Sequence, residues 1–301
     1  MRLSHYIKLG IFGLRTLLFR WKKPILGTVI LGDRCNLHCA HCAVNNIQSS
    51  MASYEQVRSE MEALYRMGIR LLFFCGGETS LWKDGEKDLH DLIREAKALG
   101  FYSVQIVTNG TISTDYPEAD LVFLSLDGMK EAHDRIRGTG TWDKVSANLR
   151  KNSTRNVVVY SAINNSNLGD IRALGDYVRE HPSLRCLSFN LHTPFSGTEH
   201  LSLNSEEREK AVGEIRRLMH DGYPIFNLET GLDHWLKGDW KSPCHQCVVV
   251  ENGRVYTCGR CVEIPGLCEK CGFLFAVEFS LLFGGDLKTI FQMSKTYLRY
   301  A

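Results

Sequence analysis

The stretch CNLHCAHC at residues 35–42 contains three cysteines and two histidines within eight positions. Cysteine thiolates are ligands for zinc and for iron–sulfur clusters. A structural zinc site takes four protein ligands, whereas three cysteines on a four-iron cluster leave one iron open to another ligand. The spacing of Cys35, Cys39 and Cys42 therefore predicts a metal site, and taken alone it leaves both metals open.

A second group of cysteines forms three C-x2-C pairs between residues 244 and 271. Any four of these thiols could form a zinc ribbon, and the same thiols could hold an iron–sulfur cluster. The total of eleven is odd and nine fall in the two groups, which favours metal binding in a reducing cytoplasm over disulfides. Cys75 and Cys186 lie in apolar runs and are expected to be structural thiols. The six cysteines of the second group are Cys244, Cys247, Cys258, Cys261, Cys268 and Cys271.

The composition is that of a globular protein. The chain has 301 residues, of which 44% are hydrophobic, and this is enough for a substantial core. Its 36 Lys and Arg against 34 Asp and Glu give a formal net charge of only +2. Nucleic-acid binders carry a clear basic excess, so no nucleic-acid partner is predicted.

From residue 24 onward, apolar strand-like runs alternate with amphipathic helical stretches, which is typical of a parallel β/α sheet. Six strands are too few to close an eight-stranded barrel. We therefore predict an α/β fold, a partial (β/α)6 barrel over residues 24–225, preceded by a basic amphipathic helix at 1–23. A small cysteine-rich extension with a C-terminal helix is expected at 226–301. The strand candidates are residues 25–31, 69–75, 102–108, 121–126, 156–163 and 184–191.

Ligands of such folds bind at the carboxyl ends of the strands, and several motifs fall there. The C-x3-C-x2-C spacing after the first strand resembles that of the radical S-adenosylmethionine (SAM) enzymes. In that family the three cysteines hold a [4Fe-4S] cluster, and SAM binds the fourth iron. Gly76, Gly77 and Glu78 match the family's GGE motif, whose backbone and carboxylate would hold the amino group of SAM.

Two further motifs extend the resemblance over residues 25–195. Thr108 and Asn109 match a frequent TNG motif after the third strand. The segment SLDGMKEAHDRIRG at 125–138 resembles the family's SLDG...HDxxRG segment, which implies that Ser125 and Asp127 lie on the ribose side of SAM. His41 stands where the family commonly has an aromatic residue that contacts adenine, and an imidazole can also stack there.

The resemblance implies an enzyme that cleaves SAM reductively to methionine and a 5'-deoxyadenosyl radical, which abstracts a hydrogen atom from a substrate. An electron donor such as flavodoxin or ferredoxin is then expected. ENGRVYTC at 251–258 resembles the opening of SPASM and twitch extensions, which implies one auxiliary [4Fe-4S] cluster. The C-x2-C-x10-C spacing is also similar to the extension of the molybdenum-cofactor cyclase, where three cysteines leave an iron open for substrate, so full and open ligation are both retained. A non-catalytic zinc or iron–sulfur redox sensor is the rival hypothesis.

The first 32 residues contain no acidic residue, and their apolar residues recur at helical spacing. This pattern predicts either an amphipathic helix at a membrane surface or a helix that packs on the barrel. We therefore expect a cytoplasmic protein, with peripheral contact at the inner face of the membrane as a hypothesis. A small molecule, a lipid or an isoprenoid is the first expected substrate. A ribosomally made peptide is the alternative, although no separate leader-peptide-binding domain is expected. The basic residues are Arg2, Lys8, Arg15, Arg20, Lys22 and Lys23.

Overall fold

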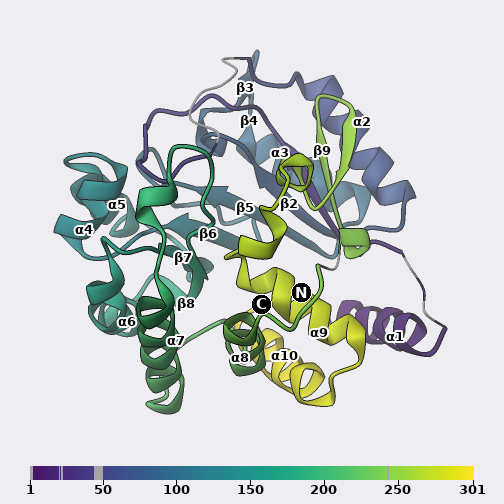
Figure 1. Ribbon diagram of the computed structural model, residues 1–301. Coiled ribbons are helices and arrows are strands. Elements are labelled where there is room, and N and C mark those ends of the chain that lie inside the picture. The colour runs from purple at the N-terminus through teal and green to yellow at the C-terminus, as the bar shows by residue number, and fades with distance from the viewer. Residues whose placement is uncertain (1–2, 20, 22, 44–49, 243) are drawn as a thin grey trace.

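The computed structural model describes residues 3–19, 21, 23–43, 50–242 and 244–301 (Figure 1). Six strands lie side by side in sequence order and pair in parallel, and each coincides with a predicted strand. The predicted α/β fold with a partial parallel barrel is confirmed. The six strands are β1 (Leu26–Ile30), β2 (Leu71–Cys75), β5 (Ser103–Thr108), β6 (Leu121–Ser125), β7 (Val157–Ile163) and β8 (Leu184–Leu191).

The cysteine-rich extension adds two strands that were not predicted from the sequence. Strand β9 (Cys247–Glu251) pairs in parallel with β1, and β10 (Arg254–Thr257) pairs antiparallel with β9. Asn252 and Gly253 connect them, both at positive φ, 49° and 74°. Asn-Gly with this backbone is a typical two-residue hairpin turn. The extension is therefore continuous with the barrel sheet, at its β1 edge.

Helices connect the strands and cover one face of the sheet. Two of these helices show how a capping residue in the sequence determines where a helix begins. The Ser53 hydroxyl accepts a hydrogen bond from the backbone N–H of Gln56, and the helix that begins at Ser205 is capped by Asn204. The covering helices are α2 (Tyr54–Arg66), α3 (Leu89–Leu99), α4 (Lys130–Arg137), α5 (Thr141–Leu149), α6 (Ile171–Glu180) and α7 (Ser205–His220). A separate two-residue ladder joins β3 (Lys83–Asp84) and β4 (Lys87–Asp88).

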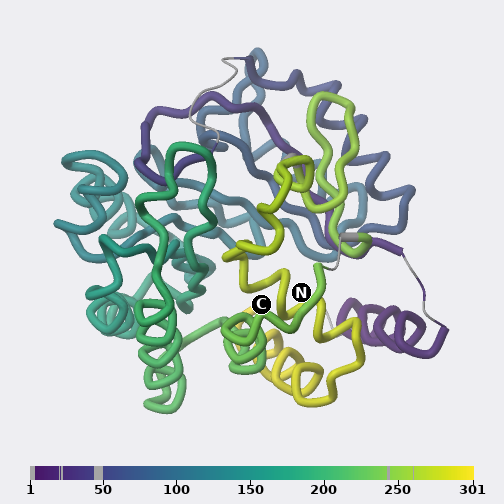
Figure 2. The backbone as a smooth tube through the Cα atoms, in the orientation of Figure 1, coloured from purple at the N-terminus to yellow at the C-terminus, as the bar shows by residue number. Residues whose placement is uncertain are grey.

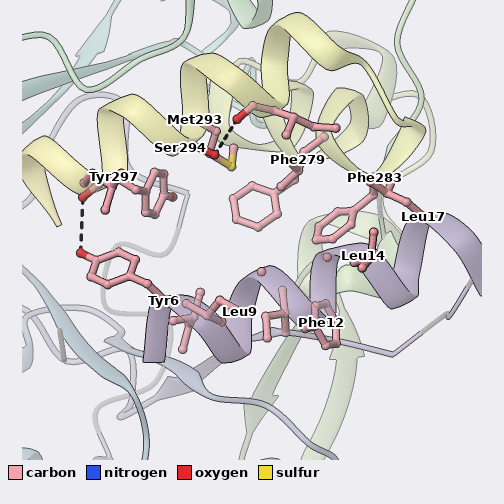
Figure 3. A pocket seen from close by; sticks show the side chains of 17 residues that line it. Tyr6, Leu9, Phe12, Leu14, Leu17, Phe279, Phe283, Met293, Ser294 and Tyr297 are labelled. Atoms are coloured by element: carbon pink, nitrogen blue, oxygen red, sulfur yellow. Dashed lines mark hydrogen bonds between the residues drawn. The ribbon is translucent and has the colours of Figure 1, made fainter. Parts of the chain in front are cut away.

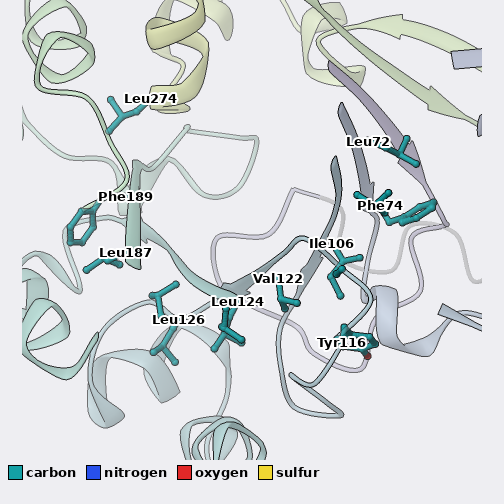
Figure 4. Close-up of a cluster of buried hydrophobic side chains, with 14 of the residues drawn as sticks. Leu72, Phe74, Ile106, Tyr116, Val122, Leu124, Leu126, Leu187, Phe189 and Leu274 are labelled. Carbon is teal, nitrogen blue, oxygen red and sulfur yellow. The ribbon is translucent and has the colours of Figure 1, made fainter. Parts of the chain in front are cut away.

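The main core lies between these helices and the sheet. Alternate residues along each strand point to this side, as expected for a strand with two buried faces. Phe74, Ile106 and Leu124 come from three neighbouring strands and are fully buried in one cluster with Phe189 of β8 (Figure 4). This core fixes the relative positions of the strand ends, and therefore of the loops that follow them.

The other face of the sheet is covered by the C-terminal helices. Phe73 and Phe123 point to this side, where Phe123 packs edge-on against Tyr160 and Phe226. Tyr300 of the last helix is buried in the same cluster. Helices α8 (Glu229–Lys237), α9 (Leu274–Gly284) and α10 (Leu287–Tyr300) pack on one another. The inner face of the partial barrel is thus filled by side chains of the chain's own C-terminus.

Helix α1 (Leu3–Phe19) lies beside α9 at one end of the molecule (Figure 2). Phe12 of α1 packs edge-on against Phe283 of α9. Arg2, Arg20 and Lys22, which belong to the predicted basic helix, lie outside the described residues. The contact with α9 confirms that α1 packs on the domain, which was one of the two predicted roles.

Glu278 of α9 is buried where α8 and α9 meet, and it predicts a pH-dependent stability. Its carboxyl accepts a hydrogen bond from the backbone N–H of Leu228 at 2.8 Å. Burial raises the pKa of Glu278 from 4.5 to about 8, so the folded protein keeps a proton that the unfolded chain has released. Stability should therefore fall as the pH rises from about 4.5 to 8, by at most on the order of 4 kcal/mol.

Urea denaturation at several pH values would measure this loss. In Glu278→Gln, which cannot ionise, the free energy of unfolding should stay flat across that interval. Glu269→Gln, at an exposed position, is the matched control and should keep the wild-type slope. A wild-type slope in Glu278→Gln would show that another group causes the effect.

Candidate active site

The three cysteines of the first motif lie on one loop that follows β1. All three thiols are partly exposed. The backbone N–H of Leu37 lies 3.4 Å from Sγ of Cys35, and the N–H of Ala40 donates to the carbonyl of Ile136 at 2.8 Å. The second bond ties the loop to the end of α4. Burial raises the pKa of Cys39 to about 11, with the Arg137 charge opposing it.

The GGE turn after β2 packs directly against this loop. The N–H of Gly77 donates to the carbonyl of Gly32 at 2.8 Å, and the N–H of Glu78 donates to that of Arg34 at 2.9 Å. A Cβ at Gly77 would lie less than 3.0 Å from the carbonyl oxygens of Asp33 and Arg34. Two backbones approach each other here without side chains between them, which explains the glycines.

Glu78 connects the GGE turn to the TNG turn after β5. Its carboxylate is 1% exposed. It accepts hydrogen bonds from the Thr108 hydroxyl at 2.5 Å, from the N–H of Asn109 at 2.6 Å and from the N–H of Ser80 at 3.0 Å. The Asn109 side-chain amide in turn donates to Asn36 Oδ1 at 2.8 Å and lies 3.8 Å from Sγ of Cys35. Three motifs that are distant in sequence thus form one hydrogen-bonded unit.

Asp127 forms a buried ion pair beside the cysteine loop. Its side chain is fully buried, and Oδ2 lies 2.6 Å from Nε of Arg137. Oδ1 accepts from the backbone N–H of Ala162 at 2.8 Å. Although burial opposes it, the Arg137 charge holds the pKa of Asp127 below its usual value. Nη1 of Arg137 lies 3.9 Å from Sγ of Cys39, so the pair directs a positive charge at a cysteine of the loop.

His41 lies next to this pair as a neutral imidazole. Its Nε2 is 3.7 Å from Oδ2 of Asp127, and its Nδ1 is buried without a hydrogen-bond partner. Burial lowers the pKa of His41 to about 4, despite the opposing Asp127 charge. Ser125 is partly exposed at the end of β6, two residues before Asp127. Ser125 and Asp127 thus lie at the end of β6, and His41 lies in the cysteine loop that follows β1, where the motifs predict the SAM contacts.

Four cysteines of the second group line one cavity of about 180 Å³, namely Cys258, Cys261, Cys268 and Cys271. Thr193 and Phe195, which follow β8, form another part of its wall. The N–H of Gly272 donates to the Thr193 hydroxyl at 2.9 Å, which fixes the last cysteines of this group against the end of β8. The cavity therefore lies at the same end of the barrel as the first cysteine loop.

The other two cysteines of this group are placed differently. Cys247 begins β9 and is buried in an apolar cluster with Ile25 and Phe279. Cys244 begins a short helical turn, and its side chain lies outside the described residues. In the part of the chain that the structure describes, no three His, Cys, Asp or Glu side chains are arranged to hold a single metal ion. Metal binding by the six cysteines of this group, Cys244 and Cys247 included, stays a prediction.

A family model described as Radical SAM superfamily matches residues 29–177. This range contains the cysteine loop, the GGE and TNG turns and the Asp127 pair. The chain is a member of the radical SAM superfamily. The predicted α/β fold and the motifs at its strand ends agree with this membership.

Curated relatives match different lengths of the chain. It is 30% identical over 222 residues to Fe-coproporphyrin III synthase of Methanosarcina barkeri, covering 67% of this chain and 54% of that protein. It is 26% identical over 291 residues to the subtilosin biosynthesis protein AlbA of Bacillus subtilis, covering 89% and 60%. The chain thus spans little more than half of the length of these curated relatives. The crystal structure of Streptococcus suis SuiB bound to precursor peptide SuiA has the same fold, with a TM-score of 0.63 and 12% identity over 95% of this chain and 72% of that one.

The residues present suit the radical SAM cluster. Three thiols share a loop beside an arginine and an asparagine amide that point at two of the sulfur atoms, and such donors favour thiolates. Arg137 has no role predicted from the motifs, although it lies in their HDRIRG segment at residues 133–138. Only the fold shows that this arginine reaches both Asp127 and Cys39. Cys186 is fully buried, as predicted for a structural thiol.

Proposed function

We propose that Cys35, Cys39 and Cys42 hold a [4Fe-4S] cluster whose open iron binds SAM, and that the chain abstracts a hydrogen atom from a substrate above the barrel. The packing of the GGE backbone against the three-cysteine loop is the observation that carries this proposal. With cluster and SAM bound, one electron breaks the sulfonium into methionine and a 5'-deoxyadenosyl radical. A flavodoxin or ferredoxin is the expected electron donor.

The surrounding residues would position the reactants. Gly76 and Gly77 let this turn contact the backbone of residues 32–34, and Glu78 holds the turn against Thr108 and Asn109. The amino group of SAM would bind at this turn, although the Glu78 carboxylate expected to hold it is buried and already accepts three hydrogen bonds. The ion pair with Asp127 holds the guanidinium of Arg137 toward Cys39. Ser125 and Asp127 remain the proposed neighbours of the ribose, and neutral His41 remains that of the adenine. The buried network around them excludes water from a reactive radical.

An auxiliary iron–sulfur cluster at the second cysteine group is part of the proposal. Four thiols around one cavity match the usual ligand number of a [4Fe-4S] cluster, so full cysteine ligation is supported by Cys258, Cys261, Cys268 and Cys271. Because the cavity lies at the end of β8, a cluster there would face the same barrel mouth as SAM. Its role would be electron transfer or substrate anchoring.

The substrate class has two candidates. A lipid or isoprenoid reached at a membrane surface is supported by exposed apolar and basic side chains on α1 and α10. A ribosomally made peptide is supported by the fold shared with SuiB, whose crystal structure contains a precursor peptide. Supplying each class to the reduced enzyme and comparing 5'-deoxyadenosine formation would separate them, because a true substrate accelerates SAM cleavage.

The variant Cys35→Ala tests the proposed chemistry. After anaerobic purification, the wild type should be brown and contain about eight irons per chain if both sites hold four-iron clusters. Cys35→Ala should lose about half of this iron and form no 5'-deoxyadenosine with SAM and dithionite. Cys186→Ala removes a buried thiol outside both sites and serves as the control, with wild-type iron content expected. Undiminished cleavage in Cys35→Ala, or a colourless zinc protein, would contradict the proposal.

A further inference from the structure

An apolar cavity of about 500 Å³ lies between α1 and the C-terminal helices α9 and α10 (Figure 3). This volume is within the range of about 300–1,000 Å³ that is usual for small-molecule sites. Leu9, Phe12 and Leu17 of α1 form one wall. Phe283 of α9 and Met293 of α10 are part of the opposite wall. Neither the family nor the proposed radical chemistry assigns a role to this cavity.

The polar groups at the cavity are already used by the protein. The Tyr6 hydroxyl donates to the carbonyl of Tyr297 at 3.5 Å, and the Ser294 hydroxyl donates to that of Ile290 at 2.9 Å. Both bonds are visible as dashed lines in Figure 3. The ligand portion inside the cavity should therefore be hydrocarbon, since it gains from apolar contact and needs no hydrogen bond.

Two glycines in the middle of α1 keep this cavity open. Gly10 and Gly13 are three residues apart on one face of the helix, and both line the cavity. A Cβ at either position would meet no atom within 4 Å. Glycine destabilises a helix interior relative to alanine. Gly10 and Gly13 therefore leave space beside α9 and α10 but lower the stability of α1.

The mouth of the cavity lies between two exposed apolar stripes with the same spacing. On α1 the stripe includes Leu14, 56% exposed, which also lines the cavity. On α10 it includes Phe291 and Leu298, 71% and 68% exposed, and Leu298 also lines the cavity. The α1 stripe consists of Ile7, Ile11, Leu14 and Leu18, and the α10 stripe of Leu287, Phe291 and Leu298, with the exposed Ser294 at the remaining position of the same spacing.

Basic side chains accompany both stripes. Lys8 and Arg15 follow Ile7 and Leu14 by one position, so they flank the α1 stripe on one side. Lys288, Lys295 and Arg299 follow residues 287, 294 and 298 in the same way on α10. Neither helix contains an acidic residue within its described bounds. Apolar residues flanked by cations are complementary to an anionic lipid surface, where headgroups meet the cations and acyl chains meet the apolar side chains.

We propose that this cavity binds one acyl chain of an anionic membrane phospholipid and thereby anchors the protein to the membrane surface. Ile25 and Leu71, which line the cavity, are at the amino ends of β1 and β2, whereas the cysteine loop and the GGE turn follow their carboxyl ends. The cavity is therefore an anchor and not the reaction chamber. The inference deepens the membrane-surface part of the proposed function and is independent of SAM cleavage. No helix among the described residues is long and apolar enough to cross a bilayer.

The probe is a phosphatidylglycerol whose acyl chain carries a photoactivatable diazirine, mixed into vesicles of phosphatidylcholine and phosphatidylglycerol. The wild-type holoenzyme should sediment with these vesicles and not with phosphatidylcholine alone. Illumination should attach the probe to peptides of α1, α9 and α10. Gly13→Leu fills the cavity without a clash at Cβ and should reduce both sedimentation and crosslinking roughly tenfold. Gly213→Leu, at an open glycine of α7, is the matched control and should behave as wild type.

Crosslinks mainly at segments that do not line the cavity, or undiminished crosslinking in Gly13→Leu, would overturn the proposal. Equal sedimentation of the wild type with both vesicle types would also do so. In solution, Gly13→Leu should still form 5'-deoxyadenosine with dithionite. Cys35→Ala should still bind vesicles, so failure of the anchor and failure of the radical chemistry give different results.

Discussion

Replacing Gly77 by alanine should abolish SAM cleavage while leaving the barrel folded. The added Cβ would lie less than 3.0 Å from the backbone oxygens of Asp33 and Arg34, so the cysteine loop would have to move. These oxygens belong to the backbone, which cannot rotate away from the new Cβ as the end of a flexible side chain could. A displacement of about 1 Å at reacting groups can reduce a rate about a hundredfold, and we expect at least this loss in Gly77→Ala.

The measurement combines iron content, 5'-deoxyadenosine formation with dithionite, and thermal unfolding. Gly213→Ala is the matched control, because its Cβ would enter open space on α7 and alanine favours a helix. It should keep full activity. Wild-type rates in Gly77→Ala would show that the loop and the GGE turn are not coupled as tightly as the structure indicates.

Asp127→Asn should cause the largest loss of stability among the site variants. Removing the charge of Asp127 leaves Arg137 buried without its partner, and breaking a buried ion pair in this way costs about 3–5 kcal/mol. Arg137 also approaches Cys39, so the iron content should fall together with the free energy of unfolding. Urea denaturation and iron analysis measure the two effects. The control is Asp143→Asn, which breaks the exposed pair with Lys130 and should change both quantities little.

A double variant separates the structural role of this pair from its effect on the cluster. Replacing a buried ion pair by apolar residues of similar size is often neutral for stability. Asp127→Leu combined with Arg137→Met should therefore regain much of the stability that Asp127→Asn loses. The iron at the first site should remain low, because no cation is then directed at Cys39. Full recovery of iron would assign the pair a purely structural role.

Much of this fold follows from local patterns in the sequence. The six barrel strands could be predicted because each is an apolar run between helical segments, and each motif residue then falls at a strand end. Strands β9 and β10 were missed because their place depends on the pairing of β9 with β1, more than 200 positions earlier in the chain. The Asn252–Gly253 turn is the signal that could have revealed the hairpin.

The site could be predicted in its parts but not in its connections. The cysteines and glycines have distinctive spacing, whereas the bonds of Asp127 and Asn109 depend on how separate loops meet. The second cysteine group illustrates the same limit. Three C-x2-C pairs suggested six ligands, but only the path of the chain shows that two of the pairs line one cavity while Cys247 lies in an apolar cluster.

The placement of the apolar cavity at the amino ends of β1 and β2 has a consequence for orientation. A protein held at the bilayer by that end would direct its catalytic face toward the aqueous phase. Soluble partners such as a peptide or an electron carrier would then have open access to that face. A lipid substrate, by contrast, would have to be lifted out of the bilayer before its reacting carbon could reach SAM. Membrane attachment would serve to concentrate the enzyme at a surface, and the chemistry itself would take place away from it.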